Sequence, residues 1–207
     1  MRFATASFSS SIHMDGAGMR QRLEDRRQFA MPDYALRAAT LDDLEAVTEI
    51  YNHYIVHSAI TFDVHPLTSG ARRAWFDEHA NSGPHRLLVA ADGHGTCVGY
   101  ASSSQWRPKP AYNTTVEVSV YCHPDACGRG CGTALYGALL AALEQEDVHT
   151  IVAGVSLPNP ASVSLHERFG FRAVGVFHAV GRKFDRFWDV AWFERPLRLQ
   201  GPGAMSA

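Results

Sequence analysis

The chain lacks long hydrophobic runs and an excess of charge of either sign. No apolar run approaches the roughly 20 residues that a membrane-spanning helix needs, so we expect no membrane partner. Lys and Arg number 19 against 21 Asp and Glu, which gives a net charge of -2 without a basic stripe. This balance argues against nucleic acid as a partner. Residues 34–197 also contain no internal repeat and no low-complexity tract.

Cysteine is scarce and unevenly placed. The four cysteines are Cys97, Cys122, Cys127 and Cys131. Three of them crowd into residues 122–131, which is a poor framework for a disulfide-stapled secreted fold, so we expect reduced thiols and a cytoplasmic protein. An alternative is a zinc site formed by three cysteines and His123, but this spacing matches no common zinc motif, and we expect no metal.

Most of the 207 residues fit one domain with a sizeable core. Residues 1–33 are rich in Ser, Arg and Met, without sustained apolar periodicity and without the apolar segment of a signal peptide. We predict a disordered leader there, or a start assigned too far upstream, with Met31 as the candidate true start. Residues 34–197 form the predicted domain, and residues 198–207 a flexible tail.

Hydrophobic periodicity and turn residues divide the domain into seven strands and four helices. The predicted strands are residues 34–38, 86–91, 96–104, 114–122, 150–155, 171–179 and 187–194. Helices are expected from a capping-box-like Thr40-x-x-Asp43, over residues 70–79, after the turn at 128–132, and from Asn159-Pro160 to Gly170. The order indicates an α/β (α+β) protein with a mixed central sheet.

The most informative stretch is residues 116–133, which read VEVSVYCHPDACGRGCGT. Valines alternate with Glu117 and its neighbours, so Glu117 lies on the face opposite the valines. Gly128, Gly130 and Gly132 then remove three Cβ atoms just before a helix begins, and backbone N–H groups can converge on an anion there. A potential base beside a phosphate cradle indicates group transfer from a phosphate-bearing cofactor.

These motifs resemble those of the GNAT superfamily of N-acetyltransferases, over residues 34 to about 197. The resemblance is carried by the glycine turn at Gly130 and Gly132, by Asn159 with Ala161 and Ser162, and by LHERFGF at residues 165–171. Residues 51–55, 115–117, 165–167 and 181–189 are similar to the phosphinothricin and methionine-sulfoximine acetyltransferases. That resemblance implies acetyl-CoA as co-substrate, a free α-amino group of a small amino-acid analogue as acceptor, and a homodimer with the acceptor pocket near the subunit interface.

One position departs from the superfamily's pattern. The first residue of the acetyl-CoA motif, usually Gln or Arg, is Cys127 here. This change removes a polar donor near the pyrophosphate, so we expect weaker binding of the cofactor through the remaining backbone amides.

The resemblance also implies catalytic roles. Glu117 is the expected base, acting directly or through a water, because an α-ammonium must lose a proton before it attacks. His166 stands where the phosphinothricin subfamily has a histidine, as acid toward the coenzyme A thiolate. Alternatively, His166 shapes the acceptor pocket or packs within its helix, and Tyr121 or Tyr136 supplies the acid. We expect direct attack rather than an acyl-enzyme on Cys131.

Acetyl-CoA is expected to bind along the strand, the turn and the next helix. The expected residues are Val118, Val120, Tyr121, Cys122, Gly128, Arg129, Gly130, Cys131, Gly132, Thr133, Asn159 and Ser162. Backbone N–H groups around residues 118–120 would stabilise the oxyanion, and Gly128–Thr133 would bind the pyrophosphate. Asn159 would hold the pantetheine arm, serve as a plain helix N-cap, or do both.

The acceptor carries a carboxylate, for which basic side chains are the candidate partners. Arg107, Lys109 and Lys183 are the candidates, with Tyr112 as an aromatic wall of the pocket. A polyamine, an aminoglycoside or a protein amine is the alternative acceptor, which an acidic pocket would favour. A non-catalytic acyl-CoA-binding domain is the alternative from another class.

Overall fold

The structure is a computed structural model, and it describes residues 34–197. The predicted leader at 1–33, with the candidate start at Met31, and the predicted tail at 198–207 lie outside the described residues. Within the described part, the helices and strands follow one another in the predicted order.

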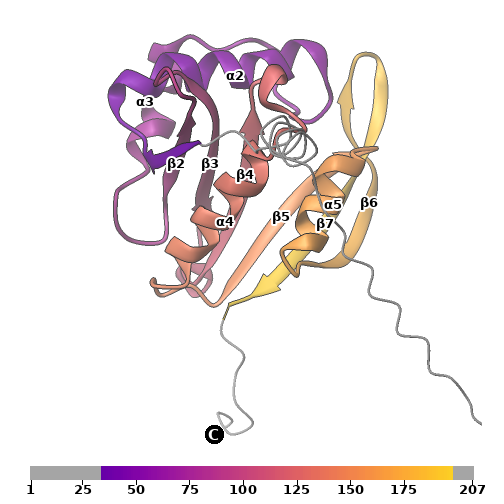
Figure 1. Cartoon of the computed structure of the whole chain (residues 1–207). Coiled ribbons are helices and arrows are strands. Elements are labelled where there is room, and N and C mark those ends of the chain that lie inside the picture. Colours follow the sequence, from indigo (N-terminus) through magenta and orange to yellow (C-terminus); the bar gives the residue numbers. More distant parts are fainter. Residues whose placement is uncertain (1–33, 198–207) are drawn as a thin grey trace, which may run out of the picture. The chain divides into compact units, whose positions relative to one another are not determined.

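Seven strands and four α-helices make up this part of the chain (Figure 1). The strands are β1 (Ala35–Ala38), β2 (Leu87–Ala91), β3 (Cys97–Gln105), β4 (Thr115–Cys122), β5 (Thr150–Leu157), β6 (Arg172–Lys183) and β7 (Arg186–Pro196). The helices are α2 (Leu44–His57), α3 (Ser69–Asp77), α4 (Cys131–Leu143) and α5 (Pro160–Arg168), with short 3-10 turns at Leu41–Asp43, Pro110–Tyr112 and Pro124–Ala126.

Hydrogen bonds of the capping residues confirm two of the predicted helix starts. Thr40 and Asp43 form a reciprocal capping box, in which the backbone N–H of Thr40 donates to the Asp43 carboxylate at 2.7 Å. Asn159 caps α5 by accepting a bond from the backbone N–H of Ser162 at 3.1 Å, and Pro160 follows at the first helical position.

The last two strands extend further than the sequence indicated. They form one long hairpin in which Lys183 pairs with Arg186. Phe184 and Asp185, the two turn residues, have φ values of 53° and 55°, which is the backbone of a tight hairpin turn that follows the twist of its strands. Neither residue is a glycine, and Asp185 is the one residue of the pair that is typical of turns.

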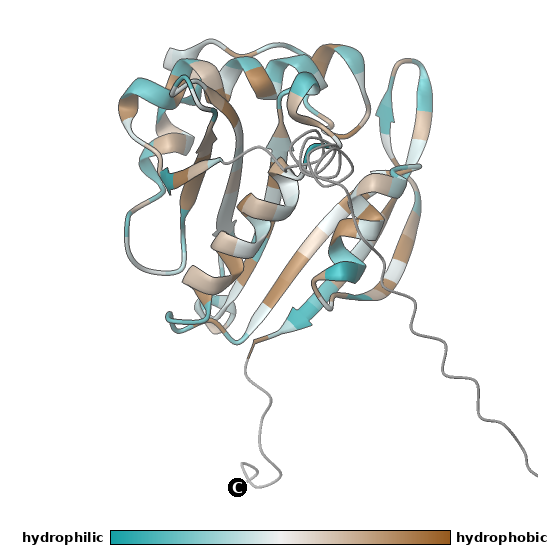
Figure 2. Cartoon of the chain, viewed as in Figure 1, coloured by the Kyte–Doolittle hydropathy of each residue, from teal (hydrophilic) through white to brown (hydrophobic). Residues whose placement is uncertain are grey.

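The strands form one sheet in the order β1-β2-β3-β4-β5-β7-β6, and only β4 and β5 run parallel. Helices α4 and α5 lie on one face, where Val116, Val118 and Ala101 join the main hydrophobic core. Helices α2 and α3 cover the other face over β2 and β3, where Val89 and Tyr100 are completely buried. Figure 2 shows hydrophobic residues on β2 and β5 and hydrophilic ones on the connecting loops.

Strands β4 and β5 separate midway along their length and form a fork between them (Figure 1). Only three residue pairs join them, and the last is Glu117 opposite Val152. Beyond that pair β4 continues to Cys122 and β5 to Leu157 without pairing to each other. The backbone groups that face this fork are therefore available to a ligand.

None of the helices within residues 34–197 is long and apolar enough to cross a membrane.

Candidate active site

Glu117 lies at the vertex of the fork, on the face away from the core valines, as the alternation predicted. Its side chain is half-buried. Burial raises the pKa of the Glu117 carboxyl, and the Arg107 guanidinium offsets part of this rise. A carboxylate with a raised pKa in a partly dry position is a suitable base for an ammonium proton.

The glycine turn has the geometry of an anion cradle. Gly128 and Gly130 take φ values of 72° and 84°, which only glycine adopts without strain. Within residues 34–197, no backbone carbonyl accepts a hydrogen bond from the N–H of Gly128 or Gly130. The N–H groups of the next three residues belong to the first turn of α4, which has no intrahelical acceptor for them. This turn fits a diphosphate such as that of coenzyme A.

The cysteines of the turn are not arranged as metal ligands. Cys131 is completely buried beneath Gly99, whose missing side chain leaves the room for the sulfur. The Cys131 thiol donates to the Val98 carbonyl at 3.9 Å. The neighbouring Cys122 thiol lowers the pKa of Cys131. Exposed Cys127 lies 3.6 Å from the Tyr54 hydroxyl. No three His, Cys, Asp or Glu side chains of residues 34–197 are placed to hold a metal ion, so the zinc alternative finds no support.

His166 lies on the opposite side of the sheet from Glu117, in the core that α5 covers. It is 4% exposed, and its ring stacks on Phe193 with centroids 5.4 Å apart. Its Nδ1 donates to the Ser162 carbonyl at 2.7 Å, and burial lowers the pKa of the imidazole. Tyr136 packs edge-on against this ring, and burial raises the pKa of the Tyr136 phenol.

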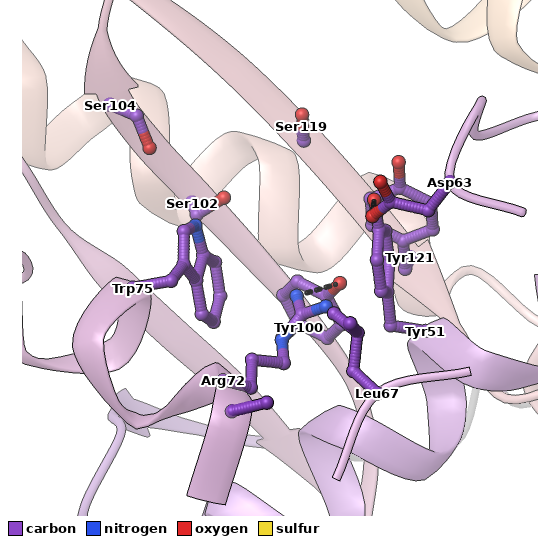
Figure 3. Close-up of a pocket in the computed structure, with 11 residues that line it drawn as sticks. Tyr51, Asp63, Leu67, Arg72, Trp75, Tyr100, Ser102, Ser104, Ser119 and Tyr121 are labelled. Atoms are coloured by element: carbon purple, nitrogen blue, oxygen red, sulfur yellow. Dashed lines mark hydrogen bonds between the residues drawn. The ribbon is translucent and has the colours of Figure 1, made fainter. Parts of the chain in front are cut away.

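A pocket of about 270 Å³ opens on the α2/α3 face, next to the fork (Figure 3). Strand residues of β3 and β4 and helical residues of α2 and α3 form its walls. The lining residues are Tyr51, Asp63, Leu67, Ala71, Arg72, Trp75, Tyr100, Ser102, Ser104, Ser119 and Tyr121. On β4, Ser119 and Tyr121 alternate with the core valines and so share the face of Glu117.

Arg72 is the dominant charge in this pocket. It is 5% exposed, and its guanidinium lies 3.9 Å from the centroid of Tyr51 and 4.1 Å from that of Trp75. Its Nη2 donates to the Tyr100 hydroxyl at 2.9 Å (Figure 3), while its buried Nε has no hydrogen-bond partner among the described residues. No carboxylate of residues 34–197 forms an ion pair with Arg72. A buried cation without an anion is expensive unless a ligand supplies one.

A second network closes the rim of the pocket. The Tyr51 hydroxyl donates to the Asp63 carboxylate at 2.7 Å and lies 2.6 Å from the Thr61 hydroxyl. Lys183, on the distant β6, donates from Nζ to the Thr61 carbonyl at 2.8 Å. Phe62 lies over Gly181 at a distance that only glycine permits. The β6–β7 hairpin therefore holds the loop that carries Asp63.

Comparison with known proteins agrees with this geometry. The family model for the acetyltransferase (GNAT) domain matches residues 36–192. The chain belongs to the GNAT acetyltransferases. A phosphinothricin N-acetyltransferase of Streptomyces coelicolor is 52% identical over 163 residues, which cover 78% of this chain and 95% of that protein. An L-methionine sulfoximine/L-methionine sulfone acetyltransferase of Pseudomonas aeruginosa is 36% identical and covers 79% and 94% respectively.

A solved structure of another GNAT acetyltransferase also matches this chain. The GNAT phosphinothricin acetyltransferase of Sinorhizobium meliloti in complex with acetyl-CoA matches with a TM-score of 0.77 at 31% identity, covering 84% of this chain and 92% of that one. The present chain is thus an acetyl-CoA-dependent N-acetyltransferase with the mixed α/β fold of its family, and the predicted family and fold are confirmed.

The predicted acceptor residues of this acetyltransferase lie apart from the Arg72 pocket. Arg107 is exposed and stacks on Trp106, beside a separate apolar hollow of about 420 Å³ over β5, β7 and β6. Tyr112 packs edge-on against Trp106, and Lys109 is exposed just before the Pro110–Tyr112 turn. Lys183 is buried, and its ammonium is occupied by Thr61.

Sequence analysis missed Arg72, Asp63 and the serines of β3 as components of the site. Arg72 sits in a short helix of mixed polarity, where an arginine ordinarily faces solvent. The serines Ser102 and Ser104 did carry a signal, because three consecutive serines, Ser102–Ser104, follow the buried residues Gly99–Ala101 in this strand. Such a run on a central strand is typical of a site wall.

Proposed function

We propose that this acetyltransferase transfers acetyl from acetyl-CoA to the α-amino group of a small amino acid or analogue, phosphinothricin and methionine sulfoximine being the named candidates. The observation that carries the proposal is Arg72, a buried guanidinium without an anion in the pocket beside the fork. The names of the relatives from Streptomyces coelicolor and Pseudomonas aeruginosa support the same acceptor class.

Arg72 would bind the carboxylate of the acceptor. Its Nη2 is fixed by Tyr100 and its plane is held between Tyr51 and Trp75, so the guanidinium is oriented in advance. The planar guanidinium with its N–H donors matches the geometry of a carboxylate, and its preorganisation reduces the entropy lost on binding. Arg107, Lys109, Tyr112 and Lys183 remain proposed as outer contacts. The Arg107 guanidinium offsets part of the rise in the pKa of Glu117, and Lys183 holds the Asp63 loop.

Glu117 would act as the base, directly or through one water. It takes a proton from the α-ammonium, and the amine nitrogen then attacks the thioester carbonyl carbon directly. The N–C bond forms and the carbonyl oxygen becomes an oxyanion. When the oxyanion collapses, the C–S bond breaks, and the second proton lost by the nitrogen goes to the thiolate sulfur. Because β4 does not pair with β5 beyond Glu117, backbone N–H groups near Val118 and Val120 are available to the oxyanion and the pantetheine arm.

The remaining cofactor contacts would follow the turn. Backbone N–H groups from Gly128 to Thr133 would hold the diphosphate, with Tyr121, Cys122, Arg129 and Cys131 shaping the strand end and the turn. Asn159 is already occupied as a helix cap, so a pantetheine contact would use its remaining donor capacity, beside Ser162. For His166, burial and the Ser162 bond support the packing alternative over the acid, and the acid role stays a prediction.

A homodimer is part of the proposal. The face of β6 and β7 that no described helix covers exposes large apolar side chains, among them Val174 at 61% and Phe177 at 60%. A second copy would cover this face. The free thiols support a reducing, cytoplasmic location.

The test measures coenzyme A release from acetyl-CoA by the purified protein. The acceptor panel contains amino acids, phosphinothricin, methionine sulfoximine, polyamines and an aminoglycoside. Turnover on the amino-acid analogues that Glu117→Gln strongly reduces is the expected result. Preference for a polyamine or an aminoglycoside contradicts the proposed acceptor. Binding of acetyl-CoA without turnover on any amine indicates the acyl-CoA-binding alternative.

A further inference from the structure

Ser104 connects two hollows on the α2/α3 face. It lies on β3 directly opposite Glu117 of β4, in a pairing that brings Cβ atoms to about 4.5–5.5 Å. It lines the acceptor pocket, where Figure 3 shows its hydroxyl at the end of the row formed with Ser102. It also lines a second hollow of about 320 Å³, together with Glu78, His79, His85 and Gln105.

His79 is oriented to receive a proton from Ser104. Its Nδ1 lies 2.8 Å from the Trp75 carbonyl oxygen, which can only accept, so Nδ1 carries the ring hydrogen. The opposite nitrogen, Nε2, is then an acceptor, and it lies 3.2 Å from the Ser104 hydroxyl oxygen. Ser104 therefore donates toward His79 and keeps its lone pairs for a donor on the pocket side.

The proposed reaction produces a proton that must leave. An ammonium and a thioester become an amide, a thiol and one free proton. Glu117, once protonated, must return to its carboxylate form before the next turnover, and its raised pKa slows that loss in a half-buried position. The site thus benefits from a route by which the proton reaches bulk water.

We propose that Ser104 and His79 form this proton outlet, an inference that rests on the proposed function. The carboxylic acid form of Glu117 gives its proton to the Ser104 oxygen, directly or through one water, while the Ser104 hydroxyl passes its own proton to His79 Nε2. The His79 imidazolium then releases the proton on Nε2 to water in the second hollow, which restores the neutral ring with its hydrogen on Nδ1. Each transfer breaks one O–H or N–H bond and forms another, and no other reactant is needed.

The surroundings of His79 suit a transient carrier of a proton. Burial lowers the pKa of the imidazole, and the bond to the Trp75 carbonyl opposes this effect in part. Glu78 favours the imidazolium, whereas His85 disfavours it, and the Trp75 ring packs against the imidazole with centroids 4.7 Å apart. His79 is consequently neutral at rest and releases an acquired proton readily.

The experiment uses His79→Ala and Ser104→Ala in the full chain, with His94→Ala in the exposed β2–β3 turn as the control. We expect kcat of His79→Ala to fall at least about tenfold at neutral pH with KM little changed, and added imidazole to restore it. Ser104→Ala should show a comparable loss that imidazole does not restore. A wild-type kcat and pH profile in His79→Ala, or a loss that imidazole leaves unchanged, overturns the outlet.

A second measurement does not depend on turnover. Nitrogen-15 NMR of the resting protein should find His79 neutral with its hydrogen on Nδ1, and Ser104→Ala should shift the Nε2 resonance. A hydrogen on Nε2 overturns the outlet even if no acceptor is turned over. Failure of the proposed function is recognised separately, by a wild-type protein that acetylates no amino-acid analogue.

Discussion

Glu117 lies opposite Val152 at the last paired register of β4 and β5, so its carboxylate stands where the two strands begin to separate. This position puts one titratable group beside both the fork that admits the thioester and the pocket that contains Arg72.

Glu117→Gln should lower kcat/KM by about 10²–10⁴-fold, because the amide cannot accept the ammonium proton. Steady-state coenzyme A release checks this, with the exposed Glu49→Gln on α2 as the matched control. In the wild type, the rate should fall as pH falls through the raised pKa of Glu117. A Glu117→Gln variant with wild-type activity would exclude Glu117 as the base.

The same substitution should stabilise the protein at neutral pH. Since burial raises the folded-state pKa of Glu117, the folded protein binds more protons than the unfolded chain as pH rises from about 4.3, and the free energy of unfolding falls over that window. Glu117→Gln removes the titrating group, and with it this fall in the free energy of unfolding. Thermal unfolding at pH 4 and pH 7.5 measures the difference between the two proteins, which should be larger at the higher pH.

Arg72→Met should raise KM for the amino-acid acceptor by about 10–100-fold, as expected for loss of a charge-assisted bond worth about 1.5–3 kcal/mol. KM for acetyl-CoA should stay the same, because Arg72 lines the acceptor pocket and not the glycine turn. Arg73→Met is the matched control, since Arg73 neighbours Arg72 but is exposed and paired with Asp77. An equal effect of both substitutions would contradict the assignment.

Gly128→Ala should raise KM for acetyl-CoA and cost about 1–2 kcal/mol of stability, because an alanine is strained at a φ of 72°. Gly95→Ala is a matched control, with a φ of 82° in the distant β2–β3 turn and open space around the added Cβ at both positions. The two variants should lose similar stability in thermal unfolding. Only Gly128→Ala should weaken acetyl-CoA binding by calorimetry.

His166→Phe should keep kcat within a few-fold of the wild type if His166 packs rather than donates a proton. A loss of about 100-fold or more would instead support the acid role. Burial lowers the folded pKa of His166, so wild-type stability should fall as pH drops below about 6.5, and the variant should lose part of that dependence. His79, whose pKa burial also lowers, adds to this fall.

Phe177→Lys should convert a dimer to a monomer, because a charge on the uncovered β6–β7 face cannot be buried against a second copy. Sedimentation equilibrium measures the mass, with Val56→Lys on exposed α2 as the control. A wild-type monomer at micromolar concentration would contradict the proposed homodimer.

The sequence by itself determined the features that depend on near neighbours. Alternation along β4 placed Glu117 on the face away from the core valines of the same strand. The Thr40–Asp43 spacing set a capping box, and Asn159-Pro160 started α5. The glycines of the turn at Gly128 and Gly130 allowed the left-handed backbone that the structure adopts. These features hold because strand alternation, caps and turns are decided within a few residues.

Only the tertiary structure decided which side chains meet. Arg72 reaches Tyr100 across 28 residues, and Lys183 reaches Thr61 across 122. Ser104 faces Glu117 because β3 and β4 pair in one register, and His79 reaches Ser104 because α3 packs on that strand. A one-residue shift in the register would turn every one of these strand residues to the other face. The packing of α3 and the pairing of distant strands therefore build the acceptor pocket, and no local pattern specifies it.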